Sequence, residues 1–322
     1  MTRDAATASG AALGVSYVVT LYNKRAFVPQ MVAGLGVQRG PFAREFVFID
    51  DGSTDGSAAE VERLTAGWPE VRIITQANHG ASHATNRGME EARLPFIKLV
   101  DGDDVLLPDA TACLLDALLG NEGAVLAFGE TVPYCAPQDA LAQLSDAPDK
   151  GAGGIEVIAN PLERLVTGNL GIGPSNSLLL TAAVRQAGGC DTRVFTQDYS
   201  LALRLAALGP FVALDRVIAL YPAVAQGRVN DGGPQVLHDA NLALAYFLEG
   251  RPLPPTLARA AIRRAAGRAY HWARRRQGAG FVSYWTWLRL VAELPLPRPP
   301  IGLVRRSCDA FTMTQPVRRG SA

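Results

Sequence analysis

Three carboxylates, Asp101, Asp103 and Asp104, follow directly after FIKLV, a mostly apolar run that is typical of a buried strand. Acids at this spacing repel one another, and a solvated turn needs only one Asp or Gly to form. Closely spaced carboxylate oxygens suit a hard divalent cation such as Mg²⁺ or Mn²⁺, which would offset the repulsion. The motif by itself leaves a metal site and a solvated turn open, so its surroundings must decide.

The composition is that of a globular protein. The chain has 322 residues, is 48% hydrophobic and carries a formal net charge of +1, which suits one large domain or two. Its four cysteines lack CxxC pairing and a His at ligand spacing, which favours a reducing cytosol over a zinc site or a disulfide framework. The first 13 residues predict a flexible tail rather than a signal peptide, and no apolar run is long enough to span a bilayer.

The first half of the chain alternates between strand and helix patterns. Strands are expected at residues 15–22, 45–50, 71–75 and 96–100, and helices at 27–35, 57–67 and 82–93. Such alternation predicts a parallel sheet with right-handed crossovers, in which ligands bind beyond the carboxyl ends of the strands. The polar clusters TLYN, DDGSTDG and DGDD follow three of these strands. We therefore expect the clusters to meet at one edge of the sheet.

Two other interpretations of these clusters fail on their context. The segment DDGSTDGSAAEVE has the spacing of a calcium-binding loop, but a helix must precede such a loop and EFVFI predicts a strand. A dinucleotide-binding fold requires a glycine-rich turn after its first strand, and TLYNKRAF contains no Gly.

Taken together, the clusters resemble family 2 glycosyltransferases, which have the GT-A fold. The resemblance runs from about Gly14 to Tyr221 and rests on VSYVVTLYNKRAF, FVFIDDGSTDGS, NHGASHATNRGMEEA, FIKLVDGDDVLLPD, AGGCD and QDYSLALRL. It implies an α/β protein of the GT-A (nucleotide-diphospho-sugar transferase) fold. We expect a mostly parallel central sheet flanked by helices, followed by a C-terminal helical extension.

The resemblance assigns the nucleotide-sugar donor to the ends of the first two strands. The matching residues are Thr20, Tyr22 and Asp51, with Asp50 beside it. An Asp carboxylate can accept a hydrogen bond from a uracil imide N–H, and a Tyr ring can stack on a base. For Tyr22 the alternative is an ordinary aromatic residue at a strand end.

The acidic cluster matches the D-x-D motif of the family. The resemblance implies Asp103 as a direct ligand of Mn²⁺ or Mg²⁺, and Asp101 as a contact to the ribose or to metal-bound water. A divalent cation there would neutralise the nucleoside diphosphate as it leaves. Asp104 is expected to cap the segment that follows and to support the motif without contacting the metal directly.

The segment TQDYSLALRL matches the part of the family that supplies the catalytic base. Asp198 fits a base that removes the proton from the acceptor hydroxyl, although it could equally cap the helix that follows. Gln197 departs from the Glu that usually precedes this Asp, which puts any role for a second carboxylate in doubt.

Three further residues are weaker candidates. The family usually has Ala-Arg-Asn where this chain has Ala-Thr-Asn, so Arg87, one residue later, could supply positive charge to the diphosphate or be a solvated helix residue. Ser175 and Asn176 match the acceptor side of the family.

The C-terminal part differs sharply in charge. From Gly250 onward it carries 14 Arg and no Lys against two acids, a net charge of +12, which leaves −11 for the preceding residues. One predicted helix has a basic face formed by Arg264, Arg268 and Arg275. The next has an apolar face formed by Phe281, Trp285, Leu288 and Ala292. Such a pair suits an anionic membrane surface or a lipid-diphosphate acceptor. The alternative is that the apolar residues pack on the catalytic domain and the arginines pair with its acids. No motif for reading nucleic acid accompanies the charge, so we expect no nucleic-acid partner.

These observations predict three parts: a flexible tail (1–13), a GT-A catalytic domain (14–225), and an Arg-rich helical extension with a Pro-rich tail (226–322). The resemblance implies a metal-dependent, inverting glycosyltransferase of hexosyltransferase type, cytoplasmic or peripheral at the inner face of the membrane. It would move a sugar, from a UDP-sugar by family frequency, to a hydroxyl of a glycan or lipid-linked acceptor. One alternative is a sugar nucleotidyltransferase, which needs a Gly- and Lys-rich phosphate loop that TLYNKRAF lacks. The other is a non-catalytic nucleotide-sugar- or glycan-binding domain, against which the presence of Asp101, Asp103 and Asp198 counts.

Overall fold

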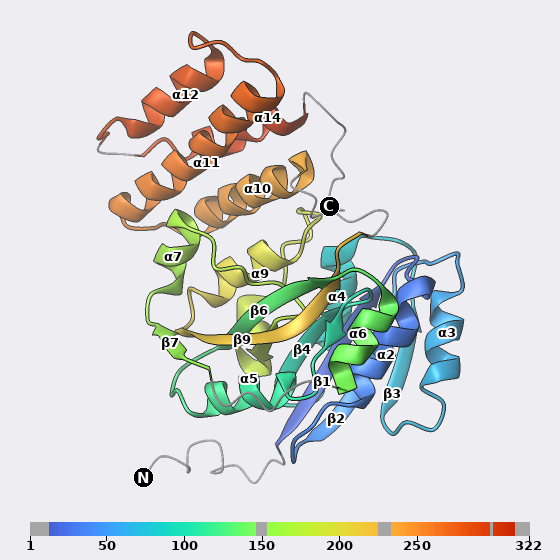
Figure 1. The fold of residues 1–322 in the computed structure, drawn as a ribbon. Helices are drawn as coiled ribbons and strands as arrows, with labels where there is room; N and C mark the ends of the chain where they lie inside the picture. Colours follow the sequence, from blue (N-terminus) through green and yellow to red (C-terminus); the bar gives the residue numbers. More distant parts are fainter. Residues whose placement is uncertain (1–12, 146–152, 225–232, 297–298, 313–322) are drawn as a thin grey trace.

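The structure is a computed structural model that describes residues 13–145, 153–224, 233–296 and 299–312. A central sheet has helices on both sides, and the C-terminal helices stack at one end of it (Figure 1). Residues 1–12 of the predicted tail and residues 313–322 of the Pro-rich tail lie outside the described residues.

The first half forms the parallel part of the sheet, as predicted. Its strands are β1 (Gly14–Leu21), β2 (Ala43–Asp50), β3 (Val71–Thr75) and β4 (Phe96–Asp101). The short 3₁₀ helix η1 (Arg25–Phe27) and the crossover helices α2 (Val28–Gly36), α3 (Ser57–Leu64) and α4 (Ala81–Glu91) connect them. β1, β2 and β4 are buried along most of their length, because helices cover both faces of the sheet.

The second half extends the same sheet. Its strands are β5 (Val105–Leu106), β6 (Leu126–Tyr134), β7 (Ile155–Ile158), β8 (Ser177–Leu180) and β9 (Phe211–Pro222). The strand order is β3-β2-β1-β4-β8-β6-β9-β5, with β7 paired to β9. β8 runs antiparallel to β4 and β6, whereas β9 runs parallel to β6.

Four helices accompany these strands: α5 (Ala110–Leu119), α7 (Pro161–Thr167), α8 (Thr181–Ala187) and α9 (Asp198–Leu205). Residues 134–154 are rich in Ala, Asp, Pro and Gly, a composition that favours an irregular segment, but part of the segment is helical. A helix, α6 (Pro137–Ser145), forms there and buries Ala140 and Leu144 against Tyr134. Residues 146–152 of the segment lie outside the described residues.

Strand register brings the polar clusters together. Leu21 of β1 lies opposite Asp50 of β2, and Thr20 lies opposite Asp101 of β4. Parallel neighbours end at the same edge of a sheet, so TLYN, DDGSTDG and DGDD share one rim. The convergence expected from the strand pattern is therefore confirmed.

The C-terminal part is helical, with α10 (Pro234–Gly250), α11 (Pro255–Arg276), α12 (Tyr284–Glu293), α13 (Gly302–Ser307) and α14 (Asp309–Thr312). Alanines such as Ala261, Ala265 and Ala269 form the buried face of α11, and small side chains let the neighbouring helices approach closely. These helices share one hydrophobic core with α4, α8 and α9.

The apolar face expected to contact a membrane is buried instead. Trp285, Leu288 and Ala292 of α12 belong to that shared core. The alternative, that these residues pack on the protein, is therefore confirmed for them. Phe281 is exposed, and the Arg274 guanidinium lies 3.9 Å from its ring centre.

Candidate functional site

The acidic turn after β4 packs tightly against the end of β1. The Gly102 N–H donates to the Thr20 carbonyl at 3.0 Å, and the Asp104 N–H donates to the Asp101 carbonyl at 3.0 Å. A Cβ on Gly102 would lie 2.4 Å from Leu21 Cδ2 and 2.8 Å from the Thr20 oxygen. Only glycine fits there, and this close fit fixes where the flanking carboxylates emerge.

Asp103 already has a cation beside it. The Lys24 ammonium lies 2.6 Å from Asp103 Oδ2 and comes from the loop after β1. The Asp103 carbonyl accepts a hydrogen bond from the Tyr134 hydroxyl at 3.1 Å. Asp103 is itself buried, and a buried carboxylate requires a charge partner, which the Lys24 ammonium provides.

Asp101 faces an excess of negative charge. Burial raises its pKa well above the usual value, and Asp104, Asp103 and Asp198 raise it further, while Lys24 opposes the shift. Gln197 Nε2 donates to Asp101 Oδ1 at 3.3 Å. An amide at position 197 thus supports Asp101 without adding a further charge.

Lys98 lies beneath this cluster and was not among the expected site residues. Its side chain is fully buried, and its ammonium donates to the Ser175 carbonyl at 2.5 Å. Burial lowers the Lys98 pKa to about 7, and the carboxylates of Asp104 and Asp101 oppose that shift. A lysine inside the otherwise apolar run FIKLV was the available signal, because buried lysines need a special reason.

The residues at this rim fit a divalent cation. Among the described residues, no three His, Cys, Asp or Glu side chains converge closely enough to hold a metal by themselves. Asp101 and Asp103 offer the oxygen ligands that Mg²⁺ and Mn²⁺ prefer. The repulsion that raises the Asp101 pKa, together with the ammonium at Asp103, shows that this rim attracts positive charge.

The loops after β1 and β2 are locked together. The Asn23 N–H donates to Ser53 Oγ at 2.9 Å, and Asn23 Oδ1 accepts from the Thr54 N–H at 2.9 Å. Asn23 adopts a φ of 52°, a left-handed conformation that Asn tolerates better than most residues. Beside it, Tyr22 is 45% exposed, so its ring is available at the rim.

Asp50 and Asp51 are buried and shape the adjoining loops. Asp50 Oδ1 accepts from the Ser53 N–H at 2.9 Å. Asp51 accepts from Gln76 Nε2 at 2.8 Å and from the backbone N–H groups of His79 at 3.0 Å and Gly80 at 2.8 Å. Both carboxylates therefore hold loops at the rim, and their contact with a nucleotide stays a prediction.

Asp198 begins α9 at the edge of this acidic cluster. Asp198 Oδ1 accepts a hydrogen bond from the Tyr199 N–H at 2.8 Å. Gln197, the N-cap residue of α9, makes no side-chain capping hydrogen bond to this helix. Burial raises the Asp198 pKa, backbone hydrogen bonds oppose this, and the nearby Asp239 carboxylate adds to the rise. A carboxylate whose pKa is moved towards neutrality suits proton abstraction.

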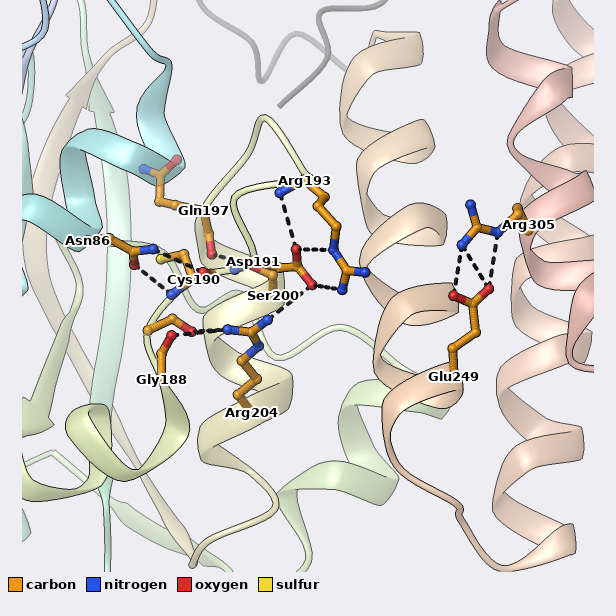
Figure 2. A network of polar contacts seen from close by, with 11 residues as sticks. Asn86, Gly188, Cys190, Asp191, Arg193, Gln197, Ser200, Arg204, Glu249 and Arg305 are labelled. Carbon is orange, nitrogen blue, oxygen red and sulfur yellow. Dashed lines mark hydrogen bonds and ion pairs between the residues drawn. The ribbon is translucent and has the colours of Figure 1, made fainter. Parts of the chain in front are cut away.

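Helix α4 anchors the loop that leads to Asp198 (Figure 2). Asn86 Nδ2 donates to the Cys190 carbonyl at 3.1 Å, and the Cys190 N–H donates to Asn86 Oδ1 at 2.7 Å. Farther along, Asp191 pairs with Arg193 at 2.7 Å and with Arg204 at 3.1 Å. These contacts tie the loop to α4 on one side and to α9 on the other.

The C-terminal helices support the same loop. Asp239 of α10 accepts from the Thr196 N–H at 3.0 Å, and its other oxygen lies 2.8 Å from His238 Nδ1. The Arg193 guanidinium lies 3.7 Å from the ring centre of Tyr246, also on α10. The expected site residues did not include Asp239, because its position beside residue 196 depends on long-range packing.

The structure does not bring Arg87 to the acidic cluster. Arg87 is exposed on α4 and pairs with Glu91 at 2.8 Å, towards the opposite end of the helix. Of its two interpretations, a solvated helix residue fits this placement.

Ser175 and Asn176 are buried rather than open to an acceptor. Ser175 Oγ accepts from the Asp101 N–H at 3.0 Å, and Asn176 Nδ2 donates to the carbonyls of Gly129 at 2.7 Å and Gly171 at 2.9 Å. Their contacts place them behind the rim, where they position Asp101 and the loop before β8.

Comparison with known proteins agrees with this geometry. Residues 16–154 match the family described as Glycosyl transferase family 2. The Escherichia coli protein named uncharacterized glycosyltransferase YibD is 34% identical over 108 residues, which are 34% of this chain and 31% of that protein. The match thus spans about a third of the relative's length. The resemblance to the family is confirmed for this part of the chain.

Solved structures extend the likeness to the fold. Residues 1–349 of S. aureus TarS in complex with UDP-GlcNAc align with a TM-score of 0.60 and 15% identity, covering 93% of this chain and 89% of that one. The mannosyltransferase PcManGT from Pyrobaculum calidifontis, in complex with GDP-Man and Mn²⁺, aligns with a TM-score of 0.56 and 16% identity, covering 93% and 86%. The GT-A fold is confirmed.

Proposed function

From the match of residues 16–154 to glycosyl transferase family 2 and from the GT-A fold, we propose that the protein transfers a sugar from a nucleotide-sugar donor to an acceptor hydroxyl. The observation that carries this proposal is the hydrogen bond from Gln197 to Asp101. It joins the acid at the end of β4 to the first turn of α9, where Asp198 lies. A donor-side acid and a candidate base therefore belong to one site.

The donor would lie along the rim formed by β1, β2 and β4. The exposed ring of Tyr22 can stack on the base, and Thr20, Asp50 and Asp51 line the ends of the same strands. A UDP-sugar is our expected donor. The named ligands of the structural neighbours, UDP-GlcNAc and GDP-Man, support a nucleotide sugar of this general class.

The proposed reaction is a single displacement with inversion at the anomeric carbon. The acceptor oxygen forms a bond to that carbon as the bond to the diphosphate oxygen breaks, and the diphosphate leaves with the electron pair. Asp198 takes the proton from the acceptor hydroxyl, and its raised pKa matches it to this task. Asn86 and Asp239 act through the loop before Asp198, so they are positioning residues.

Asp103 and Asp101 are the residues that would hold Mn²⁺ or Mg²⁺. When bound, the cation supplies charge neutralisation for the departing diphosphate. Lys24, released from Asp103, lies close enough to this rim to pair with a phosphate oxygen. Lys98 lies beneath the carboxylates, where its side-chain nitrogen donates to the Ser175 carbonyl.

Turnover of a donor panel tests the proposal. UDP-, GDP- and dTDP-sugars are incubated with the protein and Mn²⁺, and the release of nucleoside diphosphate is measured. Metal-dependent release from one donor supports a glycosyltransferase. Pyrophosphate exchange into a nucleoside triphosphate would instead identify a nucleotidyltransferase, and binding without turnover would identify a non-catalytic domain.

We further propose that the enzyme is cytoplasmic and that the outer face of α12 lies on an anionic membrane. The structure contains, within the described residues, no helix that is both long and apolar enough to cross a bilayer. On α12, however, Trp287 is 49% and Leu290 62% exposed. Arg289 of the same helix lies over the ring of Tyr270, and Arg274 of α11 lies over the ring of Phe281. Aromatic side chains beside arginines suit the interface, where each Arg contributes about 1 kcal/mol.

Co-sedimentation with vesicles containing phosphatidylglycerol tests this surface. Trp287→Ser/Leu290→Ser should lose salt-sensitive binding, whereas Leu141→Ser, an exposed leucine on α6, should keep it. Equal binding by all three proteins would contradict the proposal.

A further inference from the structure

A hollow of about 540 Å³ lies between α10 and α11, outside the site described above. Leu237 of α10 forms part of its lining, and the rest comes from α11. The helices α9, α10 and α11 lie in successive layers (Figure 1).

The lining of this hollow is strongly basic. Arg264, Arg268, Arg275 and Arg276 all contribute to it. Arg264, Arg268 and Arg275 recur at helical spacing, so the basic face expected from the sequence is a wall of this hollow. Four guanidinium groups around one cavity repel one another unless anions lie between them.

No acid in the described part of the chain forms an ion pair with these arginines. Among the described residues the arginines of the C-terminal helices that form ion pairs are Arg263, with Glu293, and Arg305, with Glu249, and neither lines the hollow. For the four arginines in the wall, the described residues show no pairing with catalytic-domain acids. His271, which also lines the hollow, has its pKa lowered by burial and then by the arginines nearby, including Arg275.

A glycine opens the wall. Gly267 lies in the middle of α11, where Gly costs about 1 kcal/mol relative to Ala. A Cβ at this position would meet nothing within 4 Å, so the residue faces the open space that it lines. The helix is thus less stable with Gly267 than with Ala, and the missing side chain leaves the hollow open, which favours a ligand site over close helix packing.

The basic wall is connected to the first turn of α9. The Arg268 guanidinium lies 5.8 Å from the ring centre of Tyr199, the residue after Asp198. Tyr199 Oη donates to the Leu165 carbonyl at 2.9 Å, and Arg264 Nη1 donates to the same oxygen. The wall of the hollow is therefore linked, through Arg268 and Tyr199, to the residue that follows the proposed base.

We propose that this hollow binds a phosphate group carried by the acceptor. The inference rests on the proposed function, because it gives the acceptor a chemical class. Arginine forks match phosphate oxygens in bidentate geometry, and several around one cavity favour a polyanionic group over a neutral sugar. The phosphate could belong to a water-soluble phosphorylated acceptor or to a lipid-linked one.

Phosphate binding by the whole protein tests the proposal. Thermal unfolding is followed in EDTA while inorganic phosphate replaces chloride at constant ionic strength, so that the metal rim does not contribute. We expect phosphate to raise the melting temperature of the wild type and to have little effect on Arg275→Gln/Arg276→Gln. Both arginines are exposed, so this variant should fold.

Two controls separate a site from general charge. Arg251→Gln/Arg263→Gln removes the same charge from exposed positions outside the hollow and should keep the phosphate effect. Gly267→Leu keeps every charge but fills the hollow, so it should lose the effect, whereas Gly267→Ala should keep it. Equal shifts in all variants, or no shift in the wild type, would overturn the proposal.

Vesicles containing phosphatidic acid distinguish the two sources of phosphate. Binding that inorganic phosphate competes away, and that Arg275→Gln/Arg276→Gln loses, identifies a lipid phosphate as the ligand. Phosphate binding without such vesicle binding identifies a soluble acceptor. Donor turnover is scored separately: turnover without phosphate binding removes this inference alone, and phosphate binding without turnover removes the proposed function alone.

Discussion

Gln197 Nε2 donates a hydrogen bond to Asp101 Oδ1 across 3.3 Å and so joins two segments 96 residues apart. One segment ends the central strand β4, and the other begins α9. Burial raises the Asp101 pKa, and the nearby charges of Asp104, Asp103 and Asp198 raise it further. The amide at position 197 therefore supports a crowded carboxylate where the family usually places another acid.

Gln197→Glu should destabilise the metal-free protein near pH 8. The change removes a donor and places a fourth negative charge near Asp101, so we expect a loss on the order of 1–3 kcal/mol. Chemical unfolding in EDTA measures it. The loss should shrink near pH 4, because the raised pKa of Asp101 favours its neutral form at low pH, and an equal loss at both pH values would contradict the account.

Asp198→Asn separates a catalytic base from a helix cap. As a base, Asp198 is needed in its ionised form, so activity should fall by about 10² or more while donor affinity changes little. The raised Asp198 pKa means that the folded protein binds an extra proton between the normal and the raised value. Stability from this group is thus lost as pH rises, and the variant should unfold at a higher temperature than the wild type near pH 8. A less stable variant with near-normal turnover would show that Asp198 is only a cap.

Asp239→Asn should move the acid limb of the pH–rate profile to lower pH. The Asp239 carboxylate is one cause of the raised Asp198 pKa, after burial. The Asn oxygen can still accept from the Thr196 N–H, which preserves the loop. Asp116→Asn, an exposed change on α5, serves as the control and should leave the profile unchanged. A limb that does not move, or that moves to higher pH, counts against coupling between α10 and the base.

Asn86→Ala should lower turnover without weakening binding of the nucleotide. It removes both hydrogen bonds to Cys190 and leaves buried backbone groups without these partners, at a cost of about 1–3 kcal/mol. Transfer kinetics and UDP titration measure the two effects separately. Asn121→Ala, which removes one hydrogen bond from Asn121 to the Ala117 carbonyl of α5, is the matched control. Weakened UDP binding with normal turnover would place Asn86 on the donor side instead.

The fold was predictable because local pattern and topology agree. Runs such as VSYVVTLY and FVFID predict strands between amphipathic helices, and parallel pairing then forces their polar ends to one rim. The ion pair of Arg87 with Glu91 could also have been read from its i,i+4 spacing.

Other features depend on contacts between distant segments. Asp239 reaches Thr196 across 43 residues, and Lys98 reaches Ser175 across 77. The periodicity of α12 correctly identified its apolar residues, but it could not show whether a membrane or the shared core covers Trp285 and Leu288. The partner of an amphipathic face is set by tertiary packing, which the helical period does not encode.

Titration of UDP with and without Mn²⁺ tests the central claim most directly, with wild type, Asp103→Asn and the control Asp116→Asn compared. Asp103 is buried in the turn after β4 with Lys24 on its carboxylate, and Asn has nearly the same shape as Asp, so the substitution removes charge rather than volume. We predict that Mn²⁺ strengthens UDP binding to the wild type and the control by at least about tenfold, which is about 1.4 kcal/mol, and has little effect on Asp103→Asn. Equal Mn²⁺-dependent affinity for all three proteins would contradict a donor site built on this carboxylate.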